Sequence, residues 1–371
     1  MTGRRELLAG LAAGGISALL GAGISPALAR PDGLRLGSSE EPASRRALWS
    51  VAGGPLLRGA VFAQRRVYPD LDGRDFLGSG PVGAPITDEA LSGLREAGAN
   101  LAVWSGPGPF SEAAPFAPDP AIVAEIETWL ARCERQGLYT VFGFRTGPGR
   151  SAFAFHPEEV WYPRQLYDDS VWREARKQAA WVEMVDWAAE RFGDAPALAG
   201  ILAMVEPNDD WLGLPGRWDA MAERLAEGWR HPGVPLLLSP GGWADMAGAD
   251  ALRRRVGPDP VIVVHSYTPR DYTHQGQGDD VRWDGAELDL PRAAGDWACL
   301  EFGAVNAAPG QDDYLASRIA QFETAGASWA AFAWGNGWPA YEARENAMAL
   351  RLSPPARTVL GEAFGANRVR P

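Results

Sequence analysis

Cysteine is scarce in this sequence, which limits how the fold can be held together. Among 371 residues only Cys133 and Cys299 are cysteines. They fall in a predicted helix and a predicted buried strand, so we interpret both as small core residues, with a disulfide as the alternative. A chain that does not depend on oxidation can complete its fold in a reducing compartment.

The sequence also lacks the signatures of several enzyme classes. The glycines of "RTGPGR" at 145–150 come without the lysine and spacing of a phosphate-binding loop, and there is no G-x-S-x-G elbow to indicate an esterase. No pair of histidines has metal-ligand spacing, although "GQGDD" and "PNDD" are candidate calcium loops. The four histidines are His156, His231, His265 and His274. We therefore expect neither a cofactor nor a metal.

Positive charge is in the minority. The formal net charge is −12 at pH 7, which argues against nucleic acid and anionic membranes as partners. Hydrophobic residues make up 46% of the chain, and 16 tryptophans add to a sizeable core, so disorder is excluded. Beyond the amino-terminal segment no apolar run reaches the roughly 18 residues that span a bilayer.

Residues 1–29 resemble a twin-arginine export signal. Arg4 and Arg5 precede a weakly apolar Gly/Ala/Leu stretch, which ends at the small-x-small cleavage sequence "ALA". An uncleaved anchor helix is the alternative. We expect a secreted or periplasmic monomer that is free of the membrane after cleavage, with a flexible lead-in at 30–54 and a single domain at 55–371.

Short apolar runs alternate with amphipathic stretches of helical period along most of the chain. The predicted strands are 58–63, 100–105, 139–144, 200–205, 234–239, 260–265, 297–302 and 328–334. The predicted helices are 87–99, 119–137, 170–193, 217–230, 249–256, 312–326 and 341–351. Eight strands with helical returns predict the α/β class and a single-domain (β/α)8 TIM barrel. A doubly wound sheet is the competing fold, but no glycine-rich phosphate loop follows the first strand.

Two predicted strands finish in glutamates. Glu206 follows "GILAMV", and Pro207 is expected to end that strand and to keep Glu206 extended. Glu301 ends the seventh strand. Because the carboxyl ends of barrel strands converge on one face, both side chains are expected at the same mouth. The alternatives are a solvated loop for Glu206 and a structural ion pair with Arg58 or Arg145 for Glu301.

Paired carboxylates of this kind suit hydrolysis of a glycosidic bond. One group must be protonated to donate to the leaving oxygen, and the other must be ionised to attack the sugar carbon. A separation of about 5 Å between the carboxyl groups indicates a retaining reaction, and about 6.5–9.5 Å an inverting one. The domain at 55–371 is therefore a candidate catalytic domain.

The strand-end motifs resemble family 5 of the glycoside hydrolases, the cellulase-like members of clan A. The motifs are the two glutamates, "HSY" at 265–267, "LEFG" at 300–303 and a tryptophan at the end of predicted strand eight. The resemblance implies an exported retaining hydrolase of cellulase or mannanase type that acts on a β-linked oligo- or polysaccharide. It further implies Glu206 as general acid/base and Glu301 as nucleophile.

The same resemblance assigns roles to the neighbours of the two glutamates. Tyr267 is expected to hydrogen-bond the nucleophile, His265 to line the subsite of the cleaved sugar, and Trp334 to form the floor under that sugar. The family's asparagine before the acid/base is replaced by Val205, and the nearest amide is Asn208. These departures leave open a carbohydrate-binding barrel without hydrolytic activity. A barrel enzyme of other chemistry, such as a lyase, and a glycosidase of another clan A family are further alternatives.

Other residues at the strand ends are candidates for sugar contacts. The family's arginine after strand two is replaced by Trp104 and Ser105, and Arg145 can supply an equivalent charge. Tryptophans in helices are assigned to the core, whereas those near strand ends are candidate sugar platforms. The cleft candidates are Trp104, Trp161, Trp243, Trp334 and Trp338. The aromatic segment 145–170 is predicted to fold over the mouth, with a surface flap as the alternative.

Overall fold

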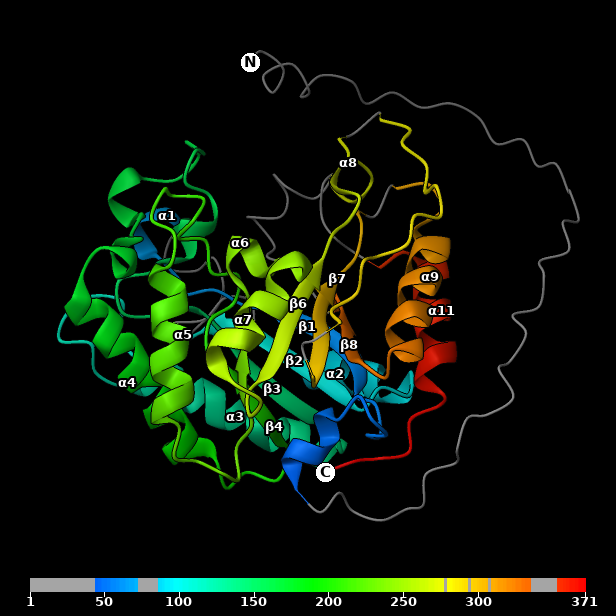
Figure 1. Cartoon of the computed structure of the whole chain (residues 1–371), viewed down its shortest axis with the longest axis horizontal. Coiled ribbons are helices and arrows are strands. Elements are labelled where there is room, and N and C mark those ends of the chain that lie inside the picture. Colours follow the sequence, from blue (N-terminus) through cyan, green and yellow to red (C-terminus); the bar gives the residue numbers. More distant parts are fainter. Residues whose placement is uncertain (1–43, 73–85, 277–278, 293–294, 306–307, 335–351) are drawn as a thin grey trace, which may run out of the picture. The chain divides into compact units, whose positions relative to one another are not determined.

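A closed barrel of parallel strands forms the centre of the protein (Figure 1). The computed structural model describes residues 44–72, 86–276, 279–292, 295–305, 308–334 and 352–371. Within these ranges the strands are β1 (Arg58–Ala63), β2 (Leu101–Pro107), β3 (Tyr139–Thr146), β4 (Leu198–Leu202), β5 (Leu236–Leu238), β6 (Val261–Ser266), β7 (Trp297–Phe302) and β8 (Ser328–Ala331). Each strand pairs with the next along the chain, and β8 pairs with β1. The prediction of a (β/α)8 barrel is confirmed.

The eight predicted strands coincide with the observed ones, but their ends differ. β1 and β7 have the predicted bounds, whereas β4 ends four residues before Glu206. The apolar run after Leu202 therefore continues outside the ladder. This extension belongs to the loop that carries Glu206, so the acid does not close a strand as expected.

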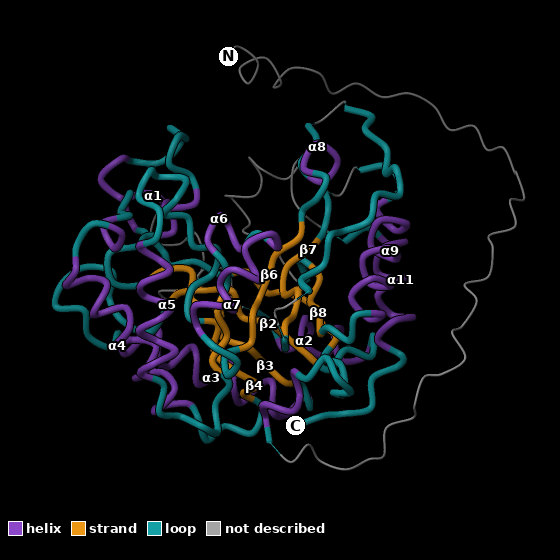
Figure 2. Tube along the Cα trace, viewed as in Figure 1, coloured by secondary structure: helices purple, strands orange, loops and turns teal. Residues whose placement is uncertain are grey.

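Helices surround the barrel strands (Figure 2). The described ones are α1 (Pro69–Asp72), α2 (Asp88–Glu96), α3 (Pro120–Gln136), α4 (Ala175–Phe192), α5 (Arg217–Gly228), α6 (Gly241–Ala244), α7 (Ala249–Val256), α8 (Arg270–Thr273), α9 (Gln311–Thr324) and α11 (Pro354–Phe364). As predicted, Thr87 caps α2 through its side chain, and Gly137 ends α3 in the left-handed conformation. The predicted helix 341–351 lies outside the described residues. In the part of the chain that is described, no helix has the length and apolarity to cross a membrane.

The core has two layers, because successive strand residues point to opposite sides of the barrel wall. We call the residues inside the wall the inner core: Leu48, Trp49, Leu57, Val61, Leu101, Val103, Tyr139, Val141, Ala199, Leu202, Val205, Leu237, Val261, Val263, Ala298, Leu300 and Ala330. The outer layer lies between strands and helices and includes Phe62, Trp104 and Phe142, which are register neighbours on β1, β2 and β3. Cys133 and Cys299 are free and buried in this outer layer, as the sequence predicted.

The amino-terminal approach to the barrel is ordered where it is described. Residues Arg45–Trp49 form a 3-10 helix that is capped by Ser44. Trp49 is buried in the inner core, and its indole N–H donates to Ala199 O at 3.0 Å. The expectation of a flexible lead-in up to residue 54 is therefore wrong for these residues, because a buried tryptophan anchors them to the barrel.

Candidate active site

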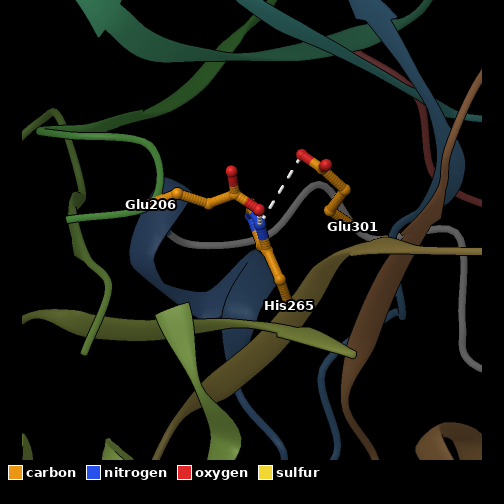
Figure 3. Close-up of side chains that lie close together, drawn as sticks. All are labelled: Glu206, His265 and Glu301. Carbon is orange, nitrogen blue, oxygen red and sulfur yellow. Dashed lines mark hydrogen bonds and ion pairs between the residues drawn. The ribbon is translucent and has the colours of Figure 1, made fainter. Parts of the chain in front are cut away.

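Three side chains, one from a loop and two from strands, meet at the carboxyl end of the barrel (Figure 3). Glu206 lies in the loop after β4, His265 lies in β6 and Glu301 lies in β7. His265 Nδ1 is 3.0 Å from Glu206 Oε1 and 3.6 Å from Glu301 Oε2. One ligand atom from each residue lies within 4.8 Å of the other two. The imidazole thus lies between two carboxylates that the sequence placed at one mouth.

The pairing of β6 with β7 orients Glu301. His265 is the register partner of Glu301, and the ladder shifts between Val264 and His265, so that Leu300 is skipped. Irregularities of this kind re-aim side chains next to functional sites. Glu301 is only 5% exposed, and Tyr267 donates its hydroxyl hydrogen to Glu301 Oε1 at 2.8 Å. This is the contact that the resemblance implied for Tyr267.

Glu206 has an unusual backbone conformation. Its φ is 50°, in the left-handed region, so the expectation of an extended residue before Pro207 is wrong. A non-glycine residue in this region costs on the order of 1–3 kcal/mol and persists only where its surroundings hold it. Arg150 binds the carbonyl oxygens of Val205 and Glu206, and Trp243 N donates to Pro207 O at 2.9 Å. These tertiary contacts override the local preference.

Burial and the charges of neighbouring side chains shift the pKa values of the three residues of the cluster. Burial alone would raise the pKa of Glu206, but the hydrogen bond and charge of His265 lower it below its ordinary value. Burial raises the pKa of Glu301, and the charge of Glu206 adds to this increase while His265 opposes it. Burial alone would lower the pKa of His265, but the charge of Glu301 and the hydrogen bond to Glu206 raise it. In the free protein, protons therefore bind His265 and Glu301 more readily than Glu206.

Arg145 supplies positive charge to the same region. Its guanidinium lies 4.0 Å from the ring centre of Phe155, and Nη1 donates to Ser105 Oγ at 3.3 Å. Its charge lowers the pKa of both site carboxyls. No carboxylate of the described residues forms an ion pair with Arg145 within 4.0 Å. Arg58 pairs with Glu323 instead, at 2.6 Å, so a structural ion pair does not account for Glu301.

Two predicted sugar platforms lie in the outer layer. Trp104 is 3% exposed and packs edge-on against Trp129 of α3, so its expected place in the cleft is wrong. Trp334 donates its indole N–H to Ala90 O of α2 at 3.0 Å, and the Arg357 guanidinium lies 4.5 Å from its ring centre. The Trp334 side chain is thus held by contacts with α2 and α11, whereas it was expected to lie under the sugar. Trp338 lies outside the described residues.

Phe332 was not predicted, yet it lies at the barrel end of β8. Its ring is half-buried against the inner core, and Phe332 N donates to Phe302 O at 2.8 Å, one residue beyond Glu301. The sequence signal was present, because an aromatic residue follows the last apolar residue of the strand. The prediction instead assigned the sugar platform to the larger Trp334, two residues later.

Aromatic rings also gather beside Glu206. Trp243, in α6, is half-buried, and its ring centre lies 6.0 Å from that of Phe155 and 6.1 Å from that of Trp211. Trp211, which was not predicted, is 47% exposed. Trp161 packs against Phe153 within the segment after β3. Trp243 is joined to the Glu206 loop through its backbone N–H, which donates to Pro207 O, and its contact with a sugar stays a prediction.

Asn208 is buried beneath the segment that follows β3. Its side-chain amide is 0% exposed, and Nδ2 donates to Ala154 O at 3.2 Å. The predicted contact between this amide and a sugar is therefore not available in this arrangement. Asn208 instead joins the Glu206 loop to residues Ala152–Phe155, which form a 3-10 helix. Part of segment 145–170 thus covers the Glu206 loop.

The cluster of Glu206, His265 and Glu301 has donors that can ligate a divalent cation. Among the residues that are described, it is the group of this kind that the geometry brings together. Short-range ligand spacing in the sequence does not reveal this cluster, because its members are 59 and 36 positions apart. The "PNDD" loop has another use, since Asp209 accepts from Trp218 N and Asp210 from Trp211 N.

Several solved structures share this barrel. A glycoside hydrolase matches with a TM-score of 0.58 and 16% identity over 75% of this chain and 88% of its own. Endoglucanase Cel5A from Thermotoga maritima matches with a TM-score of 0.58 and 15% identity over 86% and 99%. The cellulose synthase subunit Z of Clostridioides difficile matches with a TM-score of 0.56 and 13% identity over 82% and 99%. At these identities the likeness establishes the fold alone. No protein family and no curated protein sequence matches the chain.

Proposed function

We propose that this protein is a retaining β-glycoside hydrolase of cellulase or mannanase type. The observation that carries the proposal is the meeting of Glu206 and Glu301 at one buried mouth, with oxygens that lie within 4.8 Å. This spacing is close to the roughly 5–5.5 Å between the carboxyl groups of retaining enzymes and shorter than the roughly 6.5–9.5 Å of inverting ones, so it supports a retaining reaction.

In the proposed reaction Glu301 attacks the anomeric carbon and forms a covalent glycosyl intermediate. The Tyr267 hydroxyl stabilises the ionised form of this carboxylate through its 2.8 Å hydrogen bond. Glu206 protonates the departing oxygen, and it then accepts a proton from the water that releases the sugar. Glu206 therefore loses its proton in the first half-reaction and gains one in the second, whereas Glu301 is ionised before it forms the glycosyl ester and again after the ester is hydrolysed.

The pKa order in the free protein is the reverse of the order that this reaction needs. Glu206 must be protonated before bond cleavage, yet His265 lowers the pKa of its carboxyl. The required proton is nevertheless nearby, because protonated His265 carries it on Nδ1, 3.0 Å from Glu206 Oε1. We propose that substrate binding moves this proton to Glu206. His265 thus holds the proton until the leaving oxygen is in place.

A β-linked oligosaccharide is the substrate class that we propose. Structures of similar fold include Thermotoga maritima Cel5A in complex with cellobiose and with mannotriose. In this chain Phe332 offers an apolar surface on the Glu301 side of the mouth, and Trp243 and Trp211 offer one on the Glu206 side. Aromatic faces stack against the C–H faces of pyranose rings, so both surfaces suit sugar subsites.

The central experiment is substitution of the two glutamates. Glu301→Gln should lower turnover at least roughly 10³-fold, and Glu206→Gln roughly 10²–10⁴-fold on glycosides with poor leaving groups. Azide should restore activity in alanine variants, with inverted configuration for Glu301→Ala and retained configuration for Glu206→Ala. Glu112→Gln is the matched control, because Glu112 is a largely buried carboxyl outside the cluster whose pKa burial raises to about 7. Unchanged rates in either site variant refute the assignment, and exchanged azide products reverse it.

A second candidate function is carbohydrate binding without hydrolysis. Val205 occupies the position of the family's sugar-binding asparagine and is buried in the inner core, while Asn208 is held by Ala154. No amide is therefore supplied at this point to hold the sugar. Calorimetry with cello- and manno-oligosaccharides, alongside assays for released reducing ends, separates the two functions. Binding without any released sugar favours the second.

We also propose that the chain is exported through its twin-arginine segment. The support is the sequence pattern at Arg4 and Arg5. Expression of the full chain and of a variant with both arginines replaced by lysine should place the protein outside the cytoplasm only in the first case. Amino-terminal sequencing should locate cleavage after Ala29. An unprocessed chain in the membrane fraction indicates an anchor instead.

A further inference from the structure

Arg150 is buried in a place where its charge has no carboxylate partner. Its side chain is 0% exposed, and no described carboxylate lies within 4.0 Å of its nitrogens. Nη1 donates to Val205 O at 2.7 Å, and Nη2 donates to Glu206 O at 2.7 Å. Burial lowers the pKa of Arg150 to about 9. A buried, unpaired guanidinium is costly, so it requires a compensating role.

The two accepted carbonyl groups belong to the peptide planes on either side of the Glu206 Cα. One guanidinium holds both oxygens, and this restricts the relative rotation of the two planes. The φ of 50° at Glu206 is then fixed by a rigid, planar fork. Since this backbone conformation sets the direction of the Glu206 side chain, Arg150 controls where the carboxylate lies.

Arg150 is itself held firmly. It pairs with Gly147 across a tight turn, with hydrogen bonds of 2.9 and 3.0 Å in the two directions. Its guanidinium lies 4.4 Å from the ring centre of Phe155, on which Arg145 also packs. Gly149, in the same turn, has a φ of 73°, which a side chain would strain. The turn therefore presents the fork in one orientation.

We propose that Arg150 is a positioning residue that holds the Glu206 carboxylate at the leaving-group oxygen. This inference rests on the proposed function, because it requires Glu206 to be the acid/base. It goes beyond the two glutamates by assigning the geometry of the acid to a residue 56 positions earlier in the chain. The competing explanation is that Arg150 only ties two loops together and stabilises the fold.

Substrates with different leaving groups separate these explanations. The dinitrophenolate of a dinitrophenyl glycoside leaves without protonation, whereas the leaving sugar of an unactivated oligosaccharide must be protonated by the acid. Misplacement of Glu206 therefore lowers the rate of cleavage only for the oligosaccharide. Arg150→Gln and Arg150→Lys should lower kcat/KM for the oligosaccharide roughly 10- to 100-fold and change it less than about 3-fold for the dinitrophenyl glycoside. The lysine variant keeps the charge but loses the fork, so a similar loss in both variants identifies geometry as the cause.

The ratio of the two kcat/KM values is the decisive readout, because incomplete folding lowers both in proportion. Arg370→Gln is the matched control, since Arg370 also donates to partly buried carbonyl groups, Ala99 O and Gly137 O, which precede β2 and β3 at the opposite end of the barrel. Its ratio should equal that of the wild type. Equal losses on both substrates in the Arg150 variants overturn the positioning role and leave the proposed hydrolase standing. A wild type that cleaves neither substrate overturns both.

Discussion

Removal of one hydroxyl group, in Tyr267→Phe, tests the electrostatics of the proposed nucleophile. The Tyr267 hydroxyl donates to Glu301 Oε1 at 2.8 Å and favours the ionised carboxylate. Burial already raises the pKa of Glu301, so loss of this hydrogen bond raises it further. As the pH decreases, Glu301 of the variant therefore begins to lose its charge at a higher pH than Glu301 of the wild type. The acidic limb of the kcat/KM profile should therefore move to higher pH.

The size of the effect follows from the kind of hydrogen bond. A buried hydrogen bond to a charged group contributes about 1.5–3 kcal/mol, which corresponds to a roughly 10- to 150-fold loss of kcat/KM on the acidic side. The phenylalanine ring fills the same space, so the fold should be retained. At higher pH, where Glu301 is ionised in both proteins, the loss should be smaller.

The assay is the pH dependence of kcat/KM on an aryl glycoside, with Tyr272→Phe as the control. Tyr272 is also buried, but its hydroxyl donates to a neutral acceptor, Pro309 O, at 3.2 Å. The control should lose about 0.5–1.5 kcal/mol of stability and keep the wild-type profile. An acidic limb that does not move in Tyr267→Phe refutes the claim that this hydroxyl stabilises the ionised form of Glu301.

Three further outcomes are expected. Arg145→Gln should also move the acidic limb to higher pH, because the charge of Arg145 lowers the pKa of both glutamates; an unchanged profile contradicts this. Gly59→Ala should destabilise the fold by at least about 3 kcal/mol in denaturant unfolding, because its Cβ would lie 1.8 Å from Leu101 O. Gly93→Ala has open space around its Cβ, so it should stabilise the fold by about 0.4–1 kcal/mol. Trp243→Ala should raise KM for oligosaccharides with little loss of stability, and Trp104→Phe should lower the melting temperature and leave KM unchanged.

The part of the site that the sequence could predict depends on topology alone. In a parallel barrel every strand ends on the same face, so the residues after apolar runs become neighbours at any separation along the chain. This is why Glu206, His265 and Glu301 could be placed together. The same reasoning does not depend on the loops, so it still holds although β4 ends four residues before Glu206.

The errors concern which way a side chain points. Trp104 lies in an all-apolar run, where alternation is invisible, so its sequence does not show that Val103 faces the inner core and Trp104 the helices. Trp334 follows the end of β8, where strand periodicity no longer applies. At Glu206 the rule for residues before proline is local, whereas the force that overrides it comes from Arg150. Contacts between residues so far apart in the sequence cannot be predicted from the residues next to Glu206.

The arrangement around His265 explains how a buried site can hold two carboxylates. With both glutamates ionised, protonated His265 and Arg145 offset their charge, and the buried Arg150 guanidinium adds one positive charge. With the proton on Glu206 and His265 neutral, the summed charge of these groups is the same. The two states differ only in the place of one proton between atoms 3.0 Å apart, so neither requires a new buried charge. A small difference in affinity for substrate can therefore select the state in which Glu206 is an acid, although the free protein favours the other.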